Sequence, residues 1–291
     1  MTLEQLRAFV AVADRGHVTR ASEDLGLTQS AVSAALATLE RSHGVRLFQR
    51  VGRGVVLSAE GEAFLPEARG VLLRAAAANA TLQDLAGLRR GSLSIHASQT
   101  ISTYWLPARL ARFSAAHPGV DLKVRVGNSA QVAEAVIEGA AEIGFVEGRT
   151  GAEGLQRQAV GGDRLALAAA LSHPLAGAPG ASVNDLFAAE WVLREPGSGT
   201  RSEFEAALRG LGRDPALLKA PLILPSNEAV LGACASSHLL CAVSELAAGP
   251  FVAAGRVRLL PFAFPERAFE MLQRRGWTPG PAARAFLGAL T

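Results

Sequence analysis

An octapeptide, REPGSGTR at residues 194–201, contains the residue types that a catalytic or anion-binding loop requires. Two glycines bracket Ser198, Thr200 adds a second hydroxyl, and an arginine lies at each end. A Walker phosphate loop needs a lysine directly after its last glycine, and a hydrolase nucleophile elbow needs Gly-x-Ser-x-Gly. The two lysines of the chain, Lys123 and Lys219, do not follow a glycine, and the loop lacks the elbow spacing. The octapeptide is therefore predicted to hold an anion without catalysing a reaction.

The histidines and cysteines form no pattern that supports catalysis or metal binding. No histidine pair has the spacing of a zinc protease. Cys234 and Cys241 fit neither a zinc site nor a redox pair, so we expect two reduced thiols in a core. The sequence predicts no catalytic residues, no metal and no cofactor, and hence no enzyme.

Two further turns resemble the octapeptide, because Ser98-Gln99-Thr100 and Ser226-Asn227-Glu228 also place polar side chains between an expected strand and helix. Each turn alone is explained by an ordinary helix N-cap. Three turns at corresponding strand ends favour a shared anion site, since helix N-termini offer free N–H groups there. Glu147 and Glu228 would repel a highly charged anion, which favours a small ligand. The candidate ligand-binding residues are Ser98, Gln99, Thr100, Glu147, Arg194, Glu195, Gly197, Ser198, Thr200, Arg201, Ser226 and Asn227.

Alternating strands and helices must position these turns. The first series has expected strands at 92–97, 120–126 and 142–146 and helices at 100–116 and 130–138. The second starts near Trp191, with a helix from about 200, a strand at 222–224, a helix from 228 and a strand at 239–243. Each βαβαβ series indicates a parallel sheet covered by helices. Two such halves predict two α/β lobes with a cleft between them.

The first sixty residues predict three short helices. Thr2 and Gln5 have the spacing of a capping box, and Thr19 and Thr28 are expected to cap the second and third helices. Two helices joined by a tight glycine turn form a helix-turn-helix. The third helix presents small or hydrogen-bonding side chains outward and no acidic one, so it can enter a major groove.

A hairpin expected at 47–57 follows these helices, with the basic tip Gly52-Arg53-Gly54. A basic hairpin beside a helix-turn-helix suits a wing that contacts phosphates or a minor groove. A small three-helix bundle with a hairpin is the alternative. The candidate DNA-binding residues are Thr28, Gln29, Ser30, Ser33, Arg50 and Arg53.

The composition limits which classes of protein this chain can belong to. The chain has 291 residues, of which 49% are apolar, and a formal net charge of +3. That mild basic excess permits nucleic-acid binding without requiring it. The longest apolar stretch, 165–171, is too short to cross a bilayer, and Glu4 and Arg7 interrupt the N-terminal apolar pattern as no signal peptide would. We expect a cytoplasmic protein with no membrane partner.

The segment ASEDLGLTQSAVSAALATLERSHGVRLFQRVGRGVVLSAEG, at 21–61, resembles the DNA-binding domain of LysR-type transcriptional regulators. The family pattern runs from an alanine pair through SQPAVSxxIxxLE and LGxxLFxR to LTxAG. This chain departs from it at Ser22, Ser30, His43-Gly44 and 58–61. The serine that replaces the usual proline at position 30 begins the recognition helix, so it bears on base preference.

The resemblance extends beyond the first domain. HPGVDLKV, EIGFVEG and LSHPLA are similar to the family's effector-binding domain, which has the fold of periplasmic binding proteins. TISTYWLP, REPGSGTR and SNEAV resemble the regulators of sulfur-anion metabolism and carbon fixation. The resemblance implies a sulfite-like oxyanion as effector, or next a small phosphorylated or carboxylated metabolite.

A helix expected from Ser58 to about Leu88 connects the two domains. Its seam of heptad spacing comprises Leu65, Ala68, Leu72, Ala75, Asn79, Leu82 and Ala86. Such a seam favours pairing with a second chain, and in the family this helix pairs. The alternative is packing on its own domain. Pro66 predicts a kink or break near 62–66.

The predicted fold class is α+β and α/β, with three parts. These are a winged helix-turn-helix at 1–58, a linker helix at 59–90, and a two-lobed effector domain at 91–291. By resemblance, the first lobe takes about 91–161 and 267–291, and the second about 162–266. The predicted function is that of a transcriptional regulator that binds promoter DNA as a homodimer or a dimer of dimers. A small anion is predicted to control its activity. The alternatives are a metabolite-binding protein without a regulatory role and an α/β enzyme that carries a DNA-binding domain.

Overall fold

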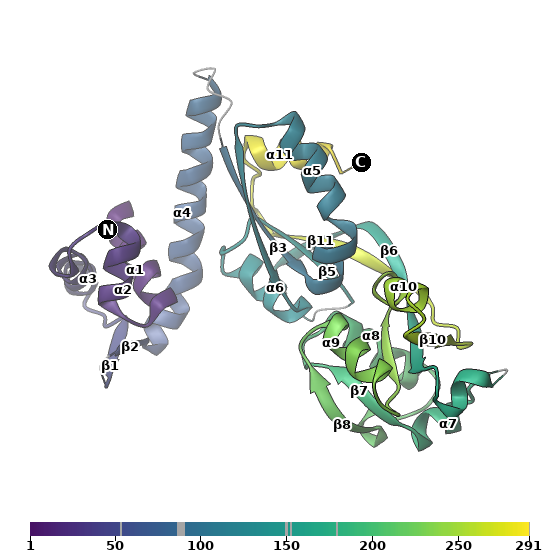
Figure 1. Cartoon of the computed structure of the whole chain (residues 1–291). Coiled ribbons are helices and arrows are strands. Elements are labelled where there is room, and N and C mark those ends of the chain that lie inside the picture. The colour runs from purple at the N-terminus through teal and green to yellow at the C-terminus, as the bar shows by residue number, and fades with distance from the viewer. Residues whose placement is uncertain (53, 86–90, 149–150, 152, 179, 291) are drawn as a thin grey trace.

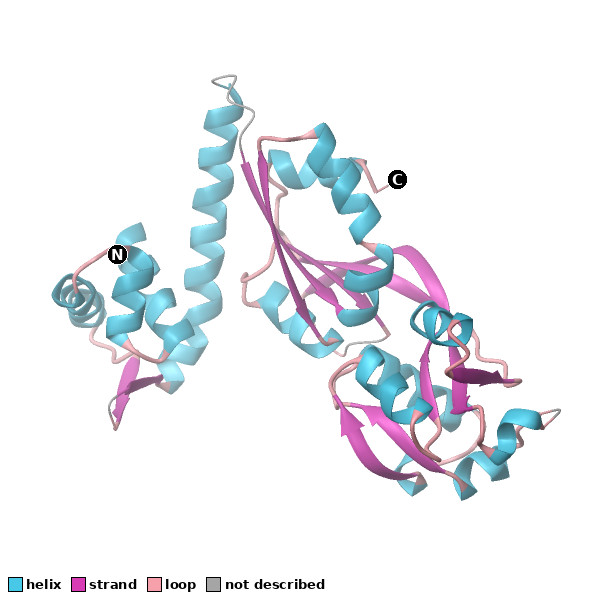
Figure 2. Ribbon diagram, in the orientation of Figure 1, coloured by secondary structure: helices cyan, strands magenta, loops and turns pink. Residues whose placement is uncertain are grey.

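The computed structural model describes residues 1–52, 54–85, 91–148, 151, 153–178 and 180–290. From the N-terminus the chain forms a small head, one long helix and two α/β lobes (Figures 1 and 2). The predictions made for Arg53 and Ala86 fall outside the described residues. Among the described helices, none is both long and apolar enough to cross a membrane.

The head consists of α1 (Leu3–Arg15), α2 (Val18–Leu25), α3 (Gln29–His43), β1 (Phe48–Val51) and β2 (Gly54–Leu57). The capping box of Thr2 and Gln5 and the cap at Thr28 form as predicted. The predicted Thr19 cap is wrong. The ring nitrogen Nδ1 of His17 accepts the Thr19 amide at 3.3 Å, because α2 begins one residue before Thr19. Buried apolar side chains, including Phe9 and Val32, join the three helices in one core.

The long helix α4 (Ala59–Leu85) stands between the head and the first lobe (Figure 1). The Ser58 hydroxyl accepts the Gly61 amide at 3.0 Å and starts the helix as predicted. Of the kink or break predicted near Pro66, the break does not occur, because the helix continues through this residue. The proline removes one backbone hydrogen bond there.

The predicted seam on α4 is divided between two environments. Leu65 and Ala68 are buried in the core of the head, so these two positions pack within their own chain. Asn79 and Leu82 are exposed, and the Leu82 side chain is 66% exposed. Only the C-terminal part of the predicted seam therefore offers a free surface.

The first lobe surrounds the parallel strands β3 (Gly91–Ser98), β4 (Val120–Gly127) and β5 (Ile143–Glu147), with helices α5 (Pro107–Ala116), α6 (Ser129–Ile137) and α11 (Pro281–Gly288). Its core includes Ile95, Phe145 and, from α11, Phe286. The single helix predicted at 100–116 is wrong. A π-helical turn, η1 (Ile101–Trp105), precedes α5, because Pro107 has no N–H to continue an unbroken helix.

The second lobe contains β7 (Glu190–Arg194), β8 (Lys219–Leu224), β9 (Cys241–Ser244) and β10 (Val257–Leu260), with η2 (Pro174–Gly177), α7 (Val183–Ala188), α8 (Gly199–Gly210), η3 (Pro215–Leu217), α9 (Asn227–Ala235) and α10 (Glu245–Ala253). Strands β7 and β8 pair in parallel, as the second predicted series requires. Trp191 and Phe204 fill its core. Both cysteines are buried free thiols, as predicted.

Two long antiparallel strands, β6 (Leu155–Ala170) and β11 (Glu266–Arg274), join the lobes. β11 pairs with β5 of the first lobe, and the far end of β6 pairs with β9 and β10 of the second. Their register shifts between Phe269 and Glu270, opposite Gly161. A Cβ on Gly161 would lie 2.7 Å from Trp105 Nε1, so only glycine lets the crossing strand pass this close.

Candidate functional site

A buried carboxylate, Glu147, lies where the ends of the lobes meet. Ser98 of the first lobe donates its hydroxyl hydrogen bond to this carboxylate, and Thr200 Oγ1 of the second lobe lies 3.5 Å from Glu147 Oε1. Ser129 Oγ donates to the Glu147 carbonyl at 2.9 Å. The Glu147 side chain is 1% exposed. Hydroxyls from both lobes thus surround one anionic group inside the protein.

Arg267 of β11 approaches this cluster from the crossing strands. Its Nη1 donates to Thr200 Oγ1 at 3.3 Å, while Nε and Nη2 donate to the carboxylate of Asp163 at 2.5 and 2.9 Å. Burial acts to lower the pKa of Arg267, but the hydrogen bond to Asp163 and the charges of Glu147 and Asp163 outweigh it and raise the pKa. Arg267 therefore stays positively charged in a buried site.

A second interlobe network surrounds Asn227, the first residue of α9. Its side-chain Nδ2 donates to Thr100 Oγ1 at 3.0 Å, and its backbone N–H donates to Gln99 Oε1 at 2.9 Å. Arg194 Nη1 donates to Asn227 Oδ1 at 2.9 Å and to Gln99 Oε1 at 3.2 Å. The Arg194 guanidinium also pairs with both carboxylate oxygens of Glu195 at 2.8 and 2.9 Å. The turns after β3, β7 and β8 therefore meet in space.

Glu228 turns toward the first lobe rather than into solvent. Tyr104 donates to its Oε1 at 2.7 Å, and Gln99 Nε2 donates to its other oxygen. Burial and the neighbouring Glu228 carboxylate raise the pKa of Tyr104, so the phenol remains a donor at neutral pH. Glu228 acts here as an interlobe acceptor.

Two of the predicted ligand-binding residues, Ser198 and Ser226, are helix N-caps, which is the alternative given for each turn in the sequence. Ser198 Oγ accepts the Arg201 amide at 3.5 Å, and Ser226 Oγ accepts the Ala229 amide at 3.1 Å. The Arg201 side chain binds Glu205 and the Arg194 carbonyl, at 2.8 and 3.1 Å. These three side chains are therefore occupied within the second lobe.

Glycines at the start of α8 bring the two lobes into backbone contact. Gly197 has a φ of +88°, and its carbonyl accepts the Ala130 amide at 3.1 Å. A Cβ on Gly199 would lie 2.0 Å from the Glu147 carbonyl oxygen and 2.5 Å from Ser129 Oγ. Any larger residue at position 199 would push the lobes apart.

Asp163, Arg267 and Ser129 belong to this site but were not predicted from the sequence. Ser129 follows Asn128, the N-cap of α6. This turn has the same polar composition as the three turns that were predicted to bind the anion. Asp163 and Arg267 lie within strands, where no turn signal marks them. A charged residue inside each of two expected crossing segments is the signal that could have revealed the pair. In the described residues, no group of three His, Cys, Asp or Glu side chains is placed to hold a metal ion.

The head presents a polar surface on α3. Thr28, Gln29, Ser30 and Ser33 are all exposed, while Val32, Leu36 and Leu39 on the opposite side are buried. Arg50 is exposed on β1, opposite Val55 of β2. The helix thus presents hydrogen-bonding side chains without an acidic group among them.

Comparison with known families identifies both parts of this architecture. The model of the LysR substrate binding domain matches residues 86–291, which is more than half of the chain, and that of the bacterial regulatory helix-turn-helix protein, lysR family, matches 3–62. The chain belongs to the LysR family of transcriptional regulators. Its fold is the one expected from the sequence: a winged helix-turn-helix head followed by a two-lobed α/β effector domain.

Individual relatives of this LysR-type regulator agree with the family assignment. It is 40% identical to the uncharacterized HTH-type transcriptional regulator YeiE of Escherichia coli K12 over 201 residues, 69% of this chain and 67% of that one. It is 31% identical to the RuBisCO operon transcriptional regulator of Allochromatium vinosum, with 98% of this chain and 94% of that one covered. Both relatives are named as transcriptional regulators.

A solved structure has the same fold over the full length. The crystal structure of full-length CbnR complexed with its target DNA matches with a TM-score of 0.67 and 22% identity, and the match covers 100% of this chain and 99% of that one.

Proposed function

We propose that this LysR-type regulator senses a small oxyanion between its lobes and transmits the binding event to promoter DNA. The proposal is carried by the convergence of the Ser98 and Thr200 hydroxyls on the buried carboxylate of Glu147, with the Arg267 guanidinium bound to Thr200 behind them. A carboxylate and a small oxyanion accept hydrogen bonds from the same donors. The hydrogen-bond donors that surround the Glu147 carboxylate are therefore of the kind that an anionic effector requires.

Glu147 makes the size and charge of the effector matter. An anion that binds beside this carboxylate meets repulsion, on the order of 4 kcal/mol for unit charges 4 Å apart at an effective dielectric constant of 20. A ligand that displaces the side chain avoids that cost and takes over its hydroxyl donors. We favour a sulfite-like oxyanion, which is small and can carry a single charge. A small phosphorylated or carboxylated metabolite is the second candidate, favoured by the likeness to a RuBisCO operon regulator.

The ligand would act by changing how the lobes meet. Donors from both lobes would bind it only when the lobes are closed, so binding shifts the population toward the closed form. Closure would reorient the heads of a homodimer or a dimer of dimers. We propose that the exposed part of the linker seam, around Leu82, lies between the subunits. We also propose that the protein acts in the cytoplasm, where the DNA is.

DNA contact is proposed through the exposed face of the head. Gln29 and Ser33 would read base edges in the major groove, and Thr28 and Ser30 would lie at the start of the same helix. Arg50 and Arg53 would contact phosphates.

The anion proposal is tested by thermal unfolding with sulfite, sulfate, thiosulfate, phosphate, small carboxylates and sugar phosphates. A ligand at a hundred times its dissociation constant stabilises the folded state by about 2.7 kcal/mol. For a unit of about 200 residues this corresponds to a rise in Tm of roughly 5–10 °C. Ser98→Ala and Thr200→Ala should each remove most of the response of the active anion. Ser226→Ala is the matched control, because this hydroxyl only caps a helix, and it should respond like the parent. If no anion raises Tm, or if both cleft variants still respond fully, the effector site lies elsewhere.

A further inference from the structure

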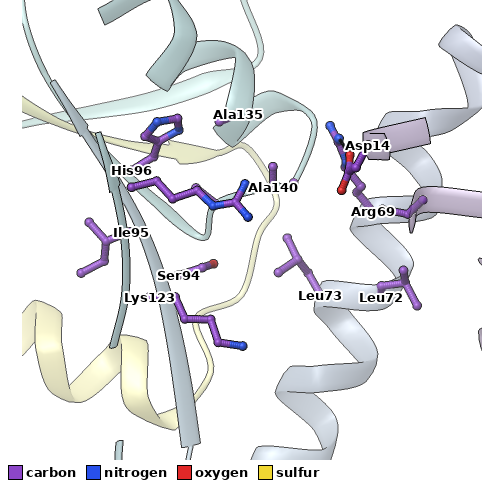
Figure 3. Close-up of a pocket in the computed structure, with 14 residues that line it drawn as sticks. Asp14, Arg69, Leu72, Leu73, Ser94, Ile95, His96, Lys123, Ala135 and Ala140 are labelled. Carbon is purple, nitrogen blue, oxygen red and sulfur yellow. Dashed lines mark hydrogen bonds and ion pairs between the residues drawn. The ribbon is translucent and has the colours of Figure 1, made fainter. Parts of the chain in front are cut away.

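A cavity of about 340 Å³ lies between the head, α4 and the first lobe (Figure 3). Its walls include Asp14 of α1, Arg69 and Leu73 of α4, His96 of β3, and Lys123 and Arg125 of β4. None of the proposed effector residues lines it. Three separate parts of the chain thus enclose a space with several charged side chains.

The wall formed by the first lobe is cationic because of strand register. β3 and β4 are parallel neighbours, with Ser94 opposite Lys123 and His96 opposite Arg125. Alternate residues of a strand point to the same face, so these four side chains share one face of the sheet. Ile95, between the two β3 residues, is buried in the core of the lobe.

These cations have little neutralisation from carboxylates. Lys123 Nζ lies 3.8 Å from a carboxylate oxygen of Asp121, and both side chains are 67% exposed. Such an exposed pair contributes little. Within the described residues, Arg125 forms no ion pair, and its charge lowers the pKa of His96 in addition to the larger effect of burial. In the part of the chain that the structure describes, the sheet face therefore carries one unpaired cation, Arg125, beside one weakly paired cation, Lys123.

The opposite wall does not supply the missing negative charge. Arg69 binds Asp14 at 2.5 Å and also binds Glu138, so these two carboxylates are already paired with its guanidinium. The Glu142 carboxylate, beside the sheet face, accepts the Ser94 amide at 3.0 Å. Leu73 points into the space from α4, next to Leu72 (Figure 3). The cavity combines one cationic wall with one partly apolar wall.

We propose that this cavity is a second ligand site, which takes a small organic polyanion with at least two phosphate or carboxylate groups. The anionic groups would bind Lys123 and Arg125, and the carbon skeleton would lie against Leu73. A ligand in this position contacts the first lobe and the linker helix together, so it would hold the head in one orientation relative to the effector domain.

Isothermal titration of the full-length protein with pyrophosphate and with citrate tests this site. The double variant Lys123→Gln with Arg125→Gln should bind the successful probe at least about tenfold more weakly, because two charge-assisted contacts are lost. Both side chains are exposed, so the fold should be retained. Lys219→Gln is the matched control, since it removes the other lysine of the chain, exposed on β8 of the second lobe, and should leave the affinity unchanged.

The cleft variant Thr200→Ala separates this site from the proposed effector site. It should bind pyrophosphate or citrate normally, while the double variant should keep its thermal response to the cleft anion. Binding of pyrophosphate alone would indicate a phosphate ligand, and binding of citrate alone a carboxylate ligand. Failure of both probes to bind, equal affinity in the double variant, or loss of probe binding in Thr200→Ala would each overturn the second site.

Discussion

Gly199→Ala is expected to hold the lobes apart. A Cβ at this position would lie 2.0 Å from the Glu147 carbonyl oxygen, whereas ordinary contacts begin at 3.4 Å. The second lobe must therefore retreat by more than an ångström where α8 meets β5. Forcing a methyl group into a packed contact costs about 1–3 kcal/mol. Because we propose that only the closed form binds the anion, this cost should appear as a roughly 5- to 150-fold loss of anion affinity.

Gly210→Ala provides the control for this substitution. Gly210 ends the same helix α8, has no left-handed φ, and a Cβ there would meet nothing within 4 Å. The two variants add the same methyl group to the same element, so titration calorimetry with the active anion isolates the effect of position. Equal affinities for Gly199→Ala and Gly210→Ala would refute the link between lobe contact and anion binding.

Three further predictions concern charge, assembly and DNA. Glu147→Gln removes a buried negative charge but keeps the side-chain shape, so the active anion should bind about tenfold tighter or more by calorimetry; unchanged or weaker binding would show that the carboxylate does not oppose the ligand. Leu82→Asp should reduce the oligomer measured by light scattering, whereas Val71→Asp, also exposed on α4 but outside the seam, should not; an intact oligomer in both excludes the seam. Ser33→Ala should cost about 1–3 kcal/mol at the preferred operator alone, while Arg50→Ala should weaken all DNA similarly and reduce the salt slope; gel-shift affinities that stay at the parent level would reject both assignments.

Local signals account for the elements that were predicted correctly. The Thr2 and Thr28 caps depend on side chains within three residues, and the parallel strand series sets which turns share an edge. The sequence therefore located the meeting point of the turns after β3, β7 and β8. The single helix predicted at 100–116 is wrong because its apolar pattern continues past Pro107, whereas the backbone hydrogen bonding cannot, since proline has no N–H.

Long-range contacts account for what was missed. Arg267 and Asp163 are 104 residues apart in the chain and meet only because β6 and β11 cross between the lobes. The hydrogen bonds from the Ser98 and Thr200 hydroxyls to Glu147 also depend on how closely the two lobes approach each other. Gly199 permits this close approach because it has no side chain. Neither fact has a local sequence pattern, because each depends on the relative position of elements built separately.

Helix α6 has a consequence for how two ligands would influence each other. Its first turn contacts the second lobe through the Ala130 amide, which donates to the Gly197 carbonyl, and its last turn, at Ala135 and beyond, lines the cavity beside α4. A helix of 9 residues is about 14 Å long and moves as a rigid body. If a ligand at either end shifts this helix, thermodynamic linkage requires the coupling to be reciprocal. The cleft anion would then change the affinity of the cavity for its polyanion by the same factor as the polyanion changes that of the cleft, and the promoter would respond to the combination of two metabolites.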